Sequence, residues 1–131
     1  MGARAVVNSI VLDAGALIAI ERGDRRVLAL CKMTSDDGGL LVVPAAVVGQ
    51  VWRDGSRQAP IARVVGARDT TIEPLDLDVA KLAGLYCGIA GTSDVIDATV
   101  VIAAHHYRAK IVSSDESDLK RLDPNVEVIR C

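Results

Sequence analysis

Short apolar runs rich in Val, Ile and Leu alternate along this chain with longer segments whose apolar residues recur at helical spacing. The strand-like runs cover residues 9–12, 40–43, 70–72, 110–113 and 126–129. The helix-like segments cover residues 16–21, 25–33, 45–53, 61–65, 79–90, 94–107 and 116–122. Strands that alternate with helices favour a mainly parallel sheet with helices on both faces and right-handed crossovers. The pattern therefore predicts an α/β fold.

The length of 131 residues predicts one domain, residues 1–131, that buries a sizeable core without disulfides. Half of the residues are hydrophobic, yet Phe is absent and aromatic residues make up only 2% of the chain. The core is therefore expected to consist of Val, Ile, Leu and Ala. These side chains suit strands that are buried on both faces.

The formal net charge of −2 predicts only weak non-specific attraction to nucleic acid. A nucleic-acid substrate would need local cations, and Arg53 and Arg57 are candidates for that contact. A solvated helix face is the alternative interpretation of both. The three cysteines are widely spaced and form no C-x-x-C motif, which argues against a zinc site or a disulfide framework. A reducing cytoplasm is the simplest compartment.

Residues 5–20 form an apolar stretch after Arg4 that resembles the core of a signal peptide. Asn8 and Asp13 interrupt it, and no clean cleavage site follows. A charged residue in the middle of a span is also unfavourable in a membrane. We therefore expect a buried first strand that continues into a helix.

Four carboxylates carry the candidate chemistry. Asp13 and Asp115 each follow a strand-like run, while Asp94 and Asp97 open a helix-like segment and share one helix face. Ligands in such folds bind outside the carboxyl ends of the strands, so the topology can bring the four together. Ionised carboxylates are unfavourable to bury without a partner, and hard divalent cations prefer oxygen ligands. Taken singly, a loop residue or a helix cap explains each aspartate; together they favour a metal site.

Divalent ions held by carboxylates can activate water and stabilise a leaving oxygen, which fits phosphodiester hydrolysis. Ser114 and Asp118 are possible accessory residues, with turn and cap chemistry as the alternative. The adjacent His105 and His106 have the wrong spacing for a helical two-histidine site. The sequence contains no nucleotide-binding glycine motif and no nucleophile elbow, so cofactor and triad chemistry are not indicated.

The chain resembles PIN-domain ribonucleases, specifically the VapC-type toxins of bacterial toxin–antitoxin pairs. The resemblance spans nearly the whole sequence, and its specificity comes from the order and spacing of its motifs. Its four motifs are Ile10-Val11-Leu12-Asp13-Ala14, Val43-Pro44-Ala45 through Val51-Trp52-Arg53, Asp94-Val95-Ile96-Asp97-Ala98, and Ile111-Val112-Ser113-Ser114-Asp115.

The resemblance implies an endoribonuclease that requires Mg²⁺ or Mn²⁺. It implies that Asp13, Asp97 and Asp115 ligate the metal and that Asp94 assists catalysis. It also implies a homodimer and a small antitoxin that covers the site, which together form a heterotetramer or a larger complex.

One position departs from the family pattern. Gln50 stands where the family usually has Glu, so its side chain can coordinate through the amide oxygen but supplies no charge. A catalytically weak or inactive module that binds RNA or protein is therefore the main alternative. A phospho-acceptor signalling domain is a third reading. This chain lacks the paired acids after the first strand and the lysine after the last strand that such domains usually have.

Overall fold

The computed structural model describes residues 8–131, so the first three residues of the apolar stretch 5–20 lie outside it. The strands are Ile10–Leu12 (β1), Leu41–Pro44 (β2), Thr70–Glu73 (β3), Lys110–Ser113 (β4) and Val128–Arg130 (β5). The helices are Ala14–Glu21 (α1), Arg25–Asp36 (α2), Ala45–Val51 (α3), Ala59–Val65 (α4), Leu77–Ala90 (α5), Val95–Tyr107 (α6) and Glu116–Leu122 (α7).

The five strands form one parallel sheet in the order β3-β2-β1-β4-β5, which confirms the predicted fold class. The chain builds outward from β1 through β2 to β3, then returns to the other side of β1 with β4. Leu12 pairs with Val112 at the carboxyl ends of these two central strands. The strand order therefore reverses between β1 and β4, and this is the position where parallel α/β sheets bind ligands.

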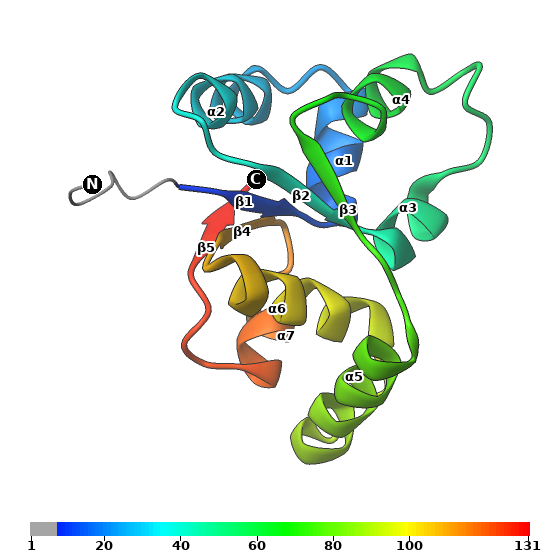
Figure 1. Cartoon of the computed structure of the whole chain (residues 1–131), viewed down its shortest axis with the longest axis vertical. Helices are drawn as coiled ribbons and strands as arrows, with labels where there is room; N and C mark the ends of the chain where they lie inside the picture. The colour runs from blue at the N-terminus through cyan, green and yellow to red at the C-terminus, as the bar shows by residue number, and fades with distance from the viewer. Residues whose placement is uncertain (1–7) are drawn as a thin grey trace.

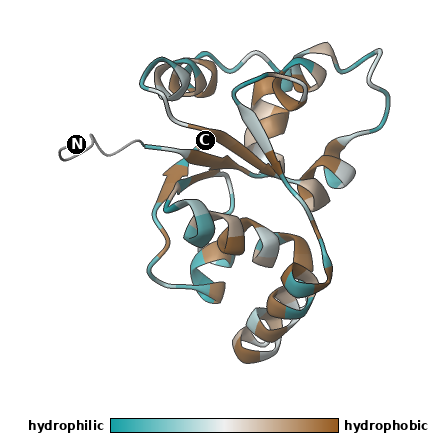
Figure 2. Ribbon diagram, in the orientation of Figure 1, coloured by the Kyte–Doolittle hydropathy of each residue, from teal (hydrophilic) through white to brown (hydrophobic). Residues whose placement is uncertain are grey.

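Helices cover both faces of the sheet (Figure 1). Helices α1 and α4 lie on one face, and α6 crosses the other beneath β1 and β2. Seven consecutive residues of α6, from Ala98 to Ala104, are buried, and every residue of β1 and β2 is buried. The apolar ribbon of the central strands in Figure 2 marks this core, which is built from small aliphatic side chains as expected.

Most elements differ from the sequence prediction by one to three residues at one or both ends, and two of these differences have a local reason. The helix predicted to reach residue 53 ends at Val51, because Trp52 is extended and the Gln58 side chain accepts the amide protons of Arg53 and Asp54. The last strand begins at Val128 instead of residue 126. The side chain of Val126 is buried, so its apolar character reflects burial in the preceding loop.

Aspartate side chains cap four helices, beginning with Asp13 at α1. Asp24 and Asp76 accept amide protons at the starts of α2 and α5. The cap of α6 is Asp94 and not a hydroxyl of Thr92 or Ser93. Thr92 Oγ1 instead accepts the Asp94 amide proton at 3.3 Å, one step before the helix begins.

Cys31 and Cys87 are buried and free, as small apolar residues are expected to be. Burial raises the pKa of the Cys31 thiol to about 11, so it stays protonated near neutral pH. Among residues 8–131, no single helix is long and apolar enough to cross a membrane, and only the bent pair of α5 and α6 together reaches that length and composition.

Candidate carboxylate site at the switch point

Asp13 joins the first strand to the first helix. It follows β1 directly, and its Oδ1 accepts the Ala16 amide proton at 2.9 Å, so the carboxylate caps α1. The residue is only 4% exposed. A buried carboxylate needs compensating hydrogen bonds, and Asp13 receives them from the Ala16 and Gly15 amides and from the Ser113 hydroxyl.

Ser113 links the ends of the two central strands. Its side chain is fully buried at the end of β4, and its hydroxyl donates to Asp13 while its Oγ accepts the Asp115 amide proton at 2.8 Å. One hydroxyl therefore orients both strand-end aspartates. Asp115 itself is exposed and does not cap α7 through its side chain, which leaves its carboxylate turned to solvent.

Asp94 and Asp97 belong to the start of α6. Asp94 Oδ1 accepts the Asp97 amide proton at 2.9 Å, which fixes the first turn of the helix. Asp97 is half-buried, whereas Asp94 is exposed. The two residues share a helix face, as their spacing predicted, but one Asp94 oxygen is committed to capping.

Burial and neighbouring negative charges raise the pKa of two of the aspartates, Asp97 and Asp13. The pKa of Asp97 rises from the usual 3.8 to about 7, first because of burial and then because of the negative charges of Asp94, Asp115 and Asp118. Burial also raises the pKa of Asp13, and the charge of Asp115 adds to that rise. The structure thus places the candidate aspartates within electrostatic reach of one another. We call Asp13, Asp94, Asp97 and Asp115 the carboxylate site.

A small cavity of about 90 Å³ opens beside the start of α6. It is lined by Thr92, Asp94, Asp97, Asp118, Arg121 and Leu122. Asp118, an accessory candidate, therefore faces the same space as Asp97. Arg121 brings a positive charge to this wall. Its position at this cavity could not be predicted from sequence, because one arginine in a charged helix carries no distinguishing pattern.

The donor set fits a hard divalent cation. All candidate ligands are carboxylate oxygens, which Mg²⁺ and Mn²⁺ prefer, and like charges held together gain from a cation. Within residues 8–131, however, no three Asp, Glu, His or Cys side chains stand close enough together to hold a metal ion. The fit therefore lies in the chemistry of the donors and not in their present spacing.

Gln50 and Arg53 lie apart from the acidic cavity. Both line a cavity of about 310 Å³ between α1 and α3, which also touches Ala14, the residue after Asp13. Arg53 donates to the carbonyls of Gly49 and Trp52, so its guanidinium folds back on its own helix. Arg57 lies in the next loop, paired with Asp54 at 3.6 Å and not at this cavity.

Ser114 packs against the first turn of α1. A Cβ at Gly15 would collide with Ser114 Oγ, so glycine permits this close approach. Both residues line a third cavity of about 510 Å³ together with Cys131. The Cys131 amide donates to the Ser113 carbonyl at 3.0 Å, which places the end of β5 beside the two strand-end aspartates. Sequence spacing gave no sign of this approach.

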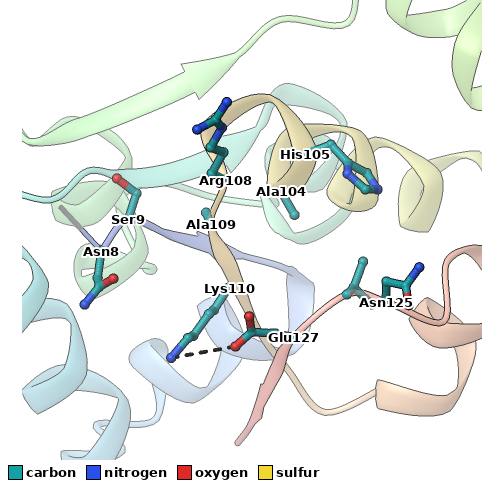
Figure 3. Close-up of a pocket in the computed structure, with 10 residues that line it drawn as sticks. Asn8, Ser9, Ala104, His105, Arg108, Ala109, Lys110, Asn125 and Glu127 are labelled. Atoms are coloured by element: carbon teal, nitrogen blue, oxygen red, sulfur yellow. Dashed lines mark ion pairs between the residues drawn. The ribbon is translucent and has the colours of Figure 1, made fainter. Parts of the chain in front are cut away.

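The opposite end of the sheet carries a different cavity, of about 330 Å³, at the amino ends of β1, β4 and β5 (Figure 3). Lys110 and Glu127 form an ion pair across it at 3.8 Å. His105 lines the cavity and pairs with Asp123, while His106 is exposed, so neither histidine joins the carboxylate site.

Searches of protein-family models and of curated proteins find no match to this chain. Solved structures do match. VapBC2 from Rickettsia felis, bound to a DNA fragment from its promoter, is 12% identical with a TM-score of 0.68, covering 93% of this chain and 98% of that one. VapC20 of Mycobacterium tuberculosis, described as a toxin that cleaves the Sarcin-Ricin loop, is 15% identical with a TM-score of 0.66, covering 94% and 100%.

FitAB bound to the IR36 DNA fragment is 16% identical with a TM-score of 0.62. That match covers 92% of this chain and 94% of the FitAB chain. All three likenesses run over nearly the whole length of both molecules, at identities where the fold alone is informative. The chain therefore has the PIN-like fold of the VapC toxins, as its sequence resemblance predicted.

Proposed function

We propose that this protein is an Mg²⁺- or Mn²⁺-dependent endoribonuclease that acts in the cytoplasm as the toxin of a toxin–antitoxin pair. One observation carries the proposal. Asp13, Asp97 and Asp115 come from three separate elements to the point where the strand order reverses, and each lies within electrostatic reach of another. Repulsion among these carboxylates lowers the stability of the folded protein. Because it occurs where parallel α/β sheets bind ligands, a functional site is the better explanation for it.

In this proposal Asp13, Asp97 and Asp115 hold the cation and Asp94 fixes the first turn of α6. The bound ion supplies Lewis acidity toward a phosphate oxygen and lowers the pKa of water. Ser113 keeps Asp13 and Asp115 oriented through its two hydrogen bonds. With a pKa of about 7 in the absence of metal, Asp97 is poised to release its proton when a cation binds.

RNA is the proposed substrate because phosphodiester hydrolysis needs a cation and ordered oxygens, which this site offers, and no redox group. VapC20, which shares the fold, is described as cleaving the Sarcin-Ricin loop. Arg53, which lines the neighbouring cavity with Gln50, is a candidate for a contact to the RNA backbone. Arg57 is exposed on the adjacent loop and would reach a longer substrate.

The proposed partners are a small antitoxin and a second copy of the chain, together forming a heterotetramer or larger complex. Helix α5 offers the face for the second copy, since Leu77, Leu85 and Ile89 are exposed, Ile89 to 90%. Figure 2 shows this helix as largely apolar. Gly84 and Gly88 leave open space on the same helix, which permits close approach of a partner. Ile89→Glu is expected to convert a dimer into a monomer in sedimentation analysis.

The decisive experiment is cleavage of a mixed RNA substrate by the purified chain with Mn²⁺, with Mg²⁺ and with EDTA. Asp97→Ala and Asp13→Ala serve as matched controls, and circular dichroism verifies that both fold. We expect metal-dependent cutting that both substitutions abolish. Cutting that survives in Asp97→Ala, or in EDTA, would overturn the proposal.

A second candidate function is favoured by Gln50. A neutral amide stands where the resembling family has Glu, in a cavity that touches Ala14, the residue after Asp13. The loss of that negative charge suits a module that binds RNA or protein without cutting. This candidate predicts no cleavage by the unmodified chain and a gain of activity in Gln50→Glu. Robust cleavage by the unmodified chain at low enzyme concentration would exclude it.

A further inference from the structure

The corner between α5 and α6 carries half of the carboxylate site, and its loop contains no buried residue. The chain bends by 110° between the two helices across residues 91–94. Gly91, Ser93 and Asp94 are exposed, and Thr92 is only half-buried. The helices themselves pack against each other, but a loop without buried side chains depends on hydrogen bonds for its local shape.

Arg121 supplies two of these hydrogen bonds from a different helix. Its Nε donates to the Ala90 carbonyl at 3.3 Å and its Nη2 to the Gly91 carbonyl at 3.2 Å. These carbonyls belong to the last turn of α5, where four carbonyls lack helical partners. A guanidinium satisfies them with a rigid planar fork and a favourable charge at the helix end. Arg121 therefore ties α7 to the corner.

A relay of hydrogen bonds runs from this tie to the aspartates. The Thr92 amide donates to the Cys87 carbonyl at 3.0 Å, and Thr92 Oγ1 accepts the Asp94 amide proton at 3.3 Å. Asp94 in turn accepts the Asp97 amide proton at 2.9 Å. Movement of residue 91 would therefore displace the start of α6.

Arg121 lines the same cavity as Asp94, Asp97 and Asp118, yet it forms no ion pair with any of them within residues 8–131. Its described hydrogen bonds point to backbone carbonyls instead. Arg121 therefore acts as a tether between α7 and the loop after α5, and not as a counter-ion that neutralises the carboxylates. A counter-ion would sit on the carboxylates and would compete with a bound cation.

We propose that Arg121 is a positioning residue of the carboxylate site, holding the corner between α5 and α6 so that Asp94 and Asp97 keep their places. The role in catalysis rests on the proposed nuclease function. The tether itself does not, because it is a property of the fold. Residues that orient metal ligands typically contribute about 10- to 100-fold to activity or metal affinity.

The test compares Arg121→Gln and Arg121→Lys with Lys120→Gln. The control removes the same charge from the same helix, where Lys120 only pairs with Glu116 at 3.6 Å. Amide hydrogen exchange at Thr92, Asp94 and Asp97 is expected to accelerate on the order of tenfold in Arg121→Gln and to change little in the control. Arg121→Lys should restore only part of the protection, because an ammonium cannot reproduce the fork.

Steady-state RNA cleavage supplies the second readout. Arg121→Gln should lower kcat by about tenfold with KM within about twofold, since the tether acts on the aspartates and not on RNA. A raised KM with unchanged kcat would overturn the proposal and assign Arg121 to substrate contact. Full recovery in Arg121→Lys would assign the effect to charge alone and also overturn it.

The exchange measurement separates the two proposals. If the unmodified chain does not cut RNA, the nuclease proposal fails, and faster exchange in Arg121→Gln still supports the tether. Unchanged exchange in that variant overturns the tether, whether or not the chain is a nuclease.

Discussion

The two ends of the central sheet treat their charged side chains in opposite ways. At the amino end, Lys110 pairs with Glu127, and His105 pairs with Asp123. At the carboxyl end, Asp97 is surrounded by other carboxylates, and its pKa rises to about 7. The amino end therefore places side chains of complementary chemistry in contact, whereas the carboxyl end leaves like charges together.

Cavity volume does not identify the carboxylate site. The amino-end cavity measures about 330 Å³, whereas the carboxyl end holds the cavity of about 510 Å³ beside Ser114 and the acidic cavity of about 90 Å³. A cavity in which Lys110 and Glu127 already pair with each other offers little uncompensated negative charge to a cation. Uncompensated charge at a topological switch is the stronger indicator of function, because selection for stability alone would remove it.

The largest expected effect comes from replacing one carboxylate with an amide at each end of the sheet. Asp97→Asn keeps the shape of the side chain and removes its charge, so we expect RNA cleavage to fall about 100-fold or more. Its melting temperature should rise by a few degrees, because like-charge repulsion is relieved. Thermal unfolding and cleavage assays on the same samples measure both quantities.

Asp123→Asn is the matched change at the other end. It removes the partner of His105, so its melting temperature should fall while cleavage stays within about twofold. A fall in stability for Asp97→Asn, or a loss of cleavage for Asp123→Asn, would contradict the contrast between the two ends.

A smaller effect is expected from Ser113→Ala. The substitution removes a buried hydroxyl that donates to Asp13 and leaves the Asp115 amide without its acceptor. We expect a loss of roughly 1–3 kcal/mol in the free energy of unfolding and about tenfold lower cleavage. Denaturant titration measures the first, and Ser117→Ala on exposed α7 is the control.

A smaller effect is expected in the pH dependence of the melting temperature of the metal-free protein. Asp97 titrates near 7 in the folded chain and near its usual 3.8 when unfolded, so the folded state binds more protons between these values. Lowering the pH from 8 to 5 should therefore raise the melting temperature through this group. Asp97→Asn should flatten that part of the profile, and Mn²⁺ should stabilise the unmodified chain most above pH 7.

The smallest effect belongs to Lys110→Ala. Its ion pair with Glu127 is exposed and spans 3.8 Å, and such pairs contribute about 0–1 kcal/mol. Stability and cleavage are both expected to stay nearly unchanged. A clear loss of cleavage would show that the amino-end cavity takes part in function after all.

The fold could be predicted from the sequence because the hydrophobic periodicity and the residue types of the strands indicate the same elements. Every predicted strand and helix exists in the predicted order. The central strands β1, β2 and β4 are largely buried and form continuous apolar runs, which makes them easy to predict. Boundaries shifted where side chains decide them, as Gln58 does after Val51. Such contacts join residues across a loop and leave no periodic signal.

The site was accessible only in part. Asp13 and Asp115 follow strands, so their meeting follows from a parallel sheet once the strand order is known. The tie from Arg121 to Gly91 joins residues far apart in the chain, and spacing cannot reveal it. The sequence also placed Gln50 beside the aspartates by resemblance, while in the structure it lines a neighbouring cavity with Arg53.

The pairing of β1 with β4 has a consequence for the newly made protein. Asp13 and Asp115 lie roughly a hundred residues apart, and the buried hydroxyl that orients both belongs to the later strand. A nascent chain on the ribosome therefore carries only separate aspartates until β4 and Asp115 have been translated. If the protein cleaves RNA, the mRNA from which it is translated is therefore exposed to a complete carboxylate site only after β4 has been synthesised and folded.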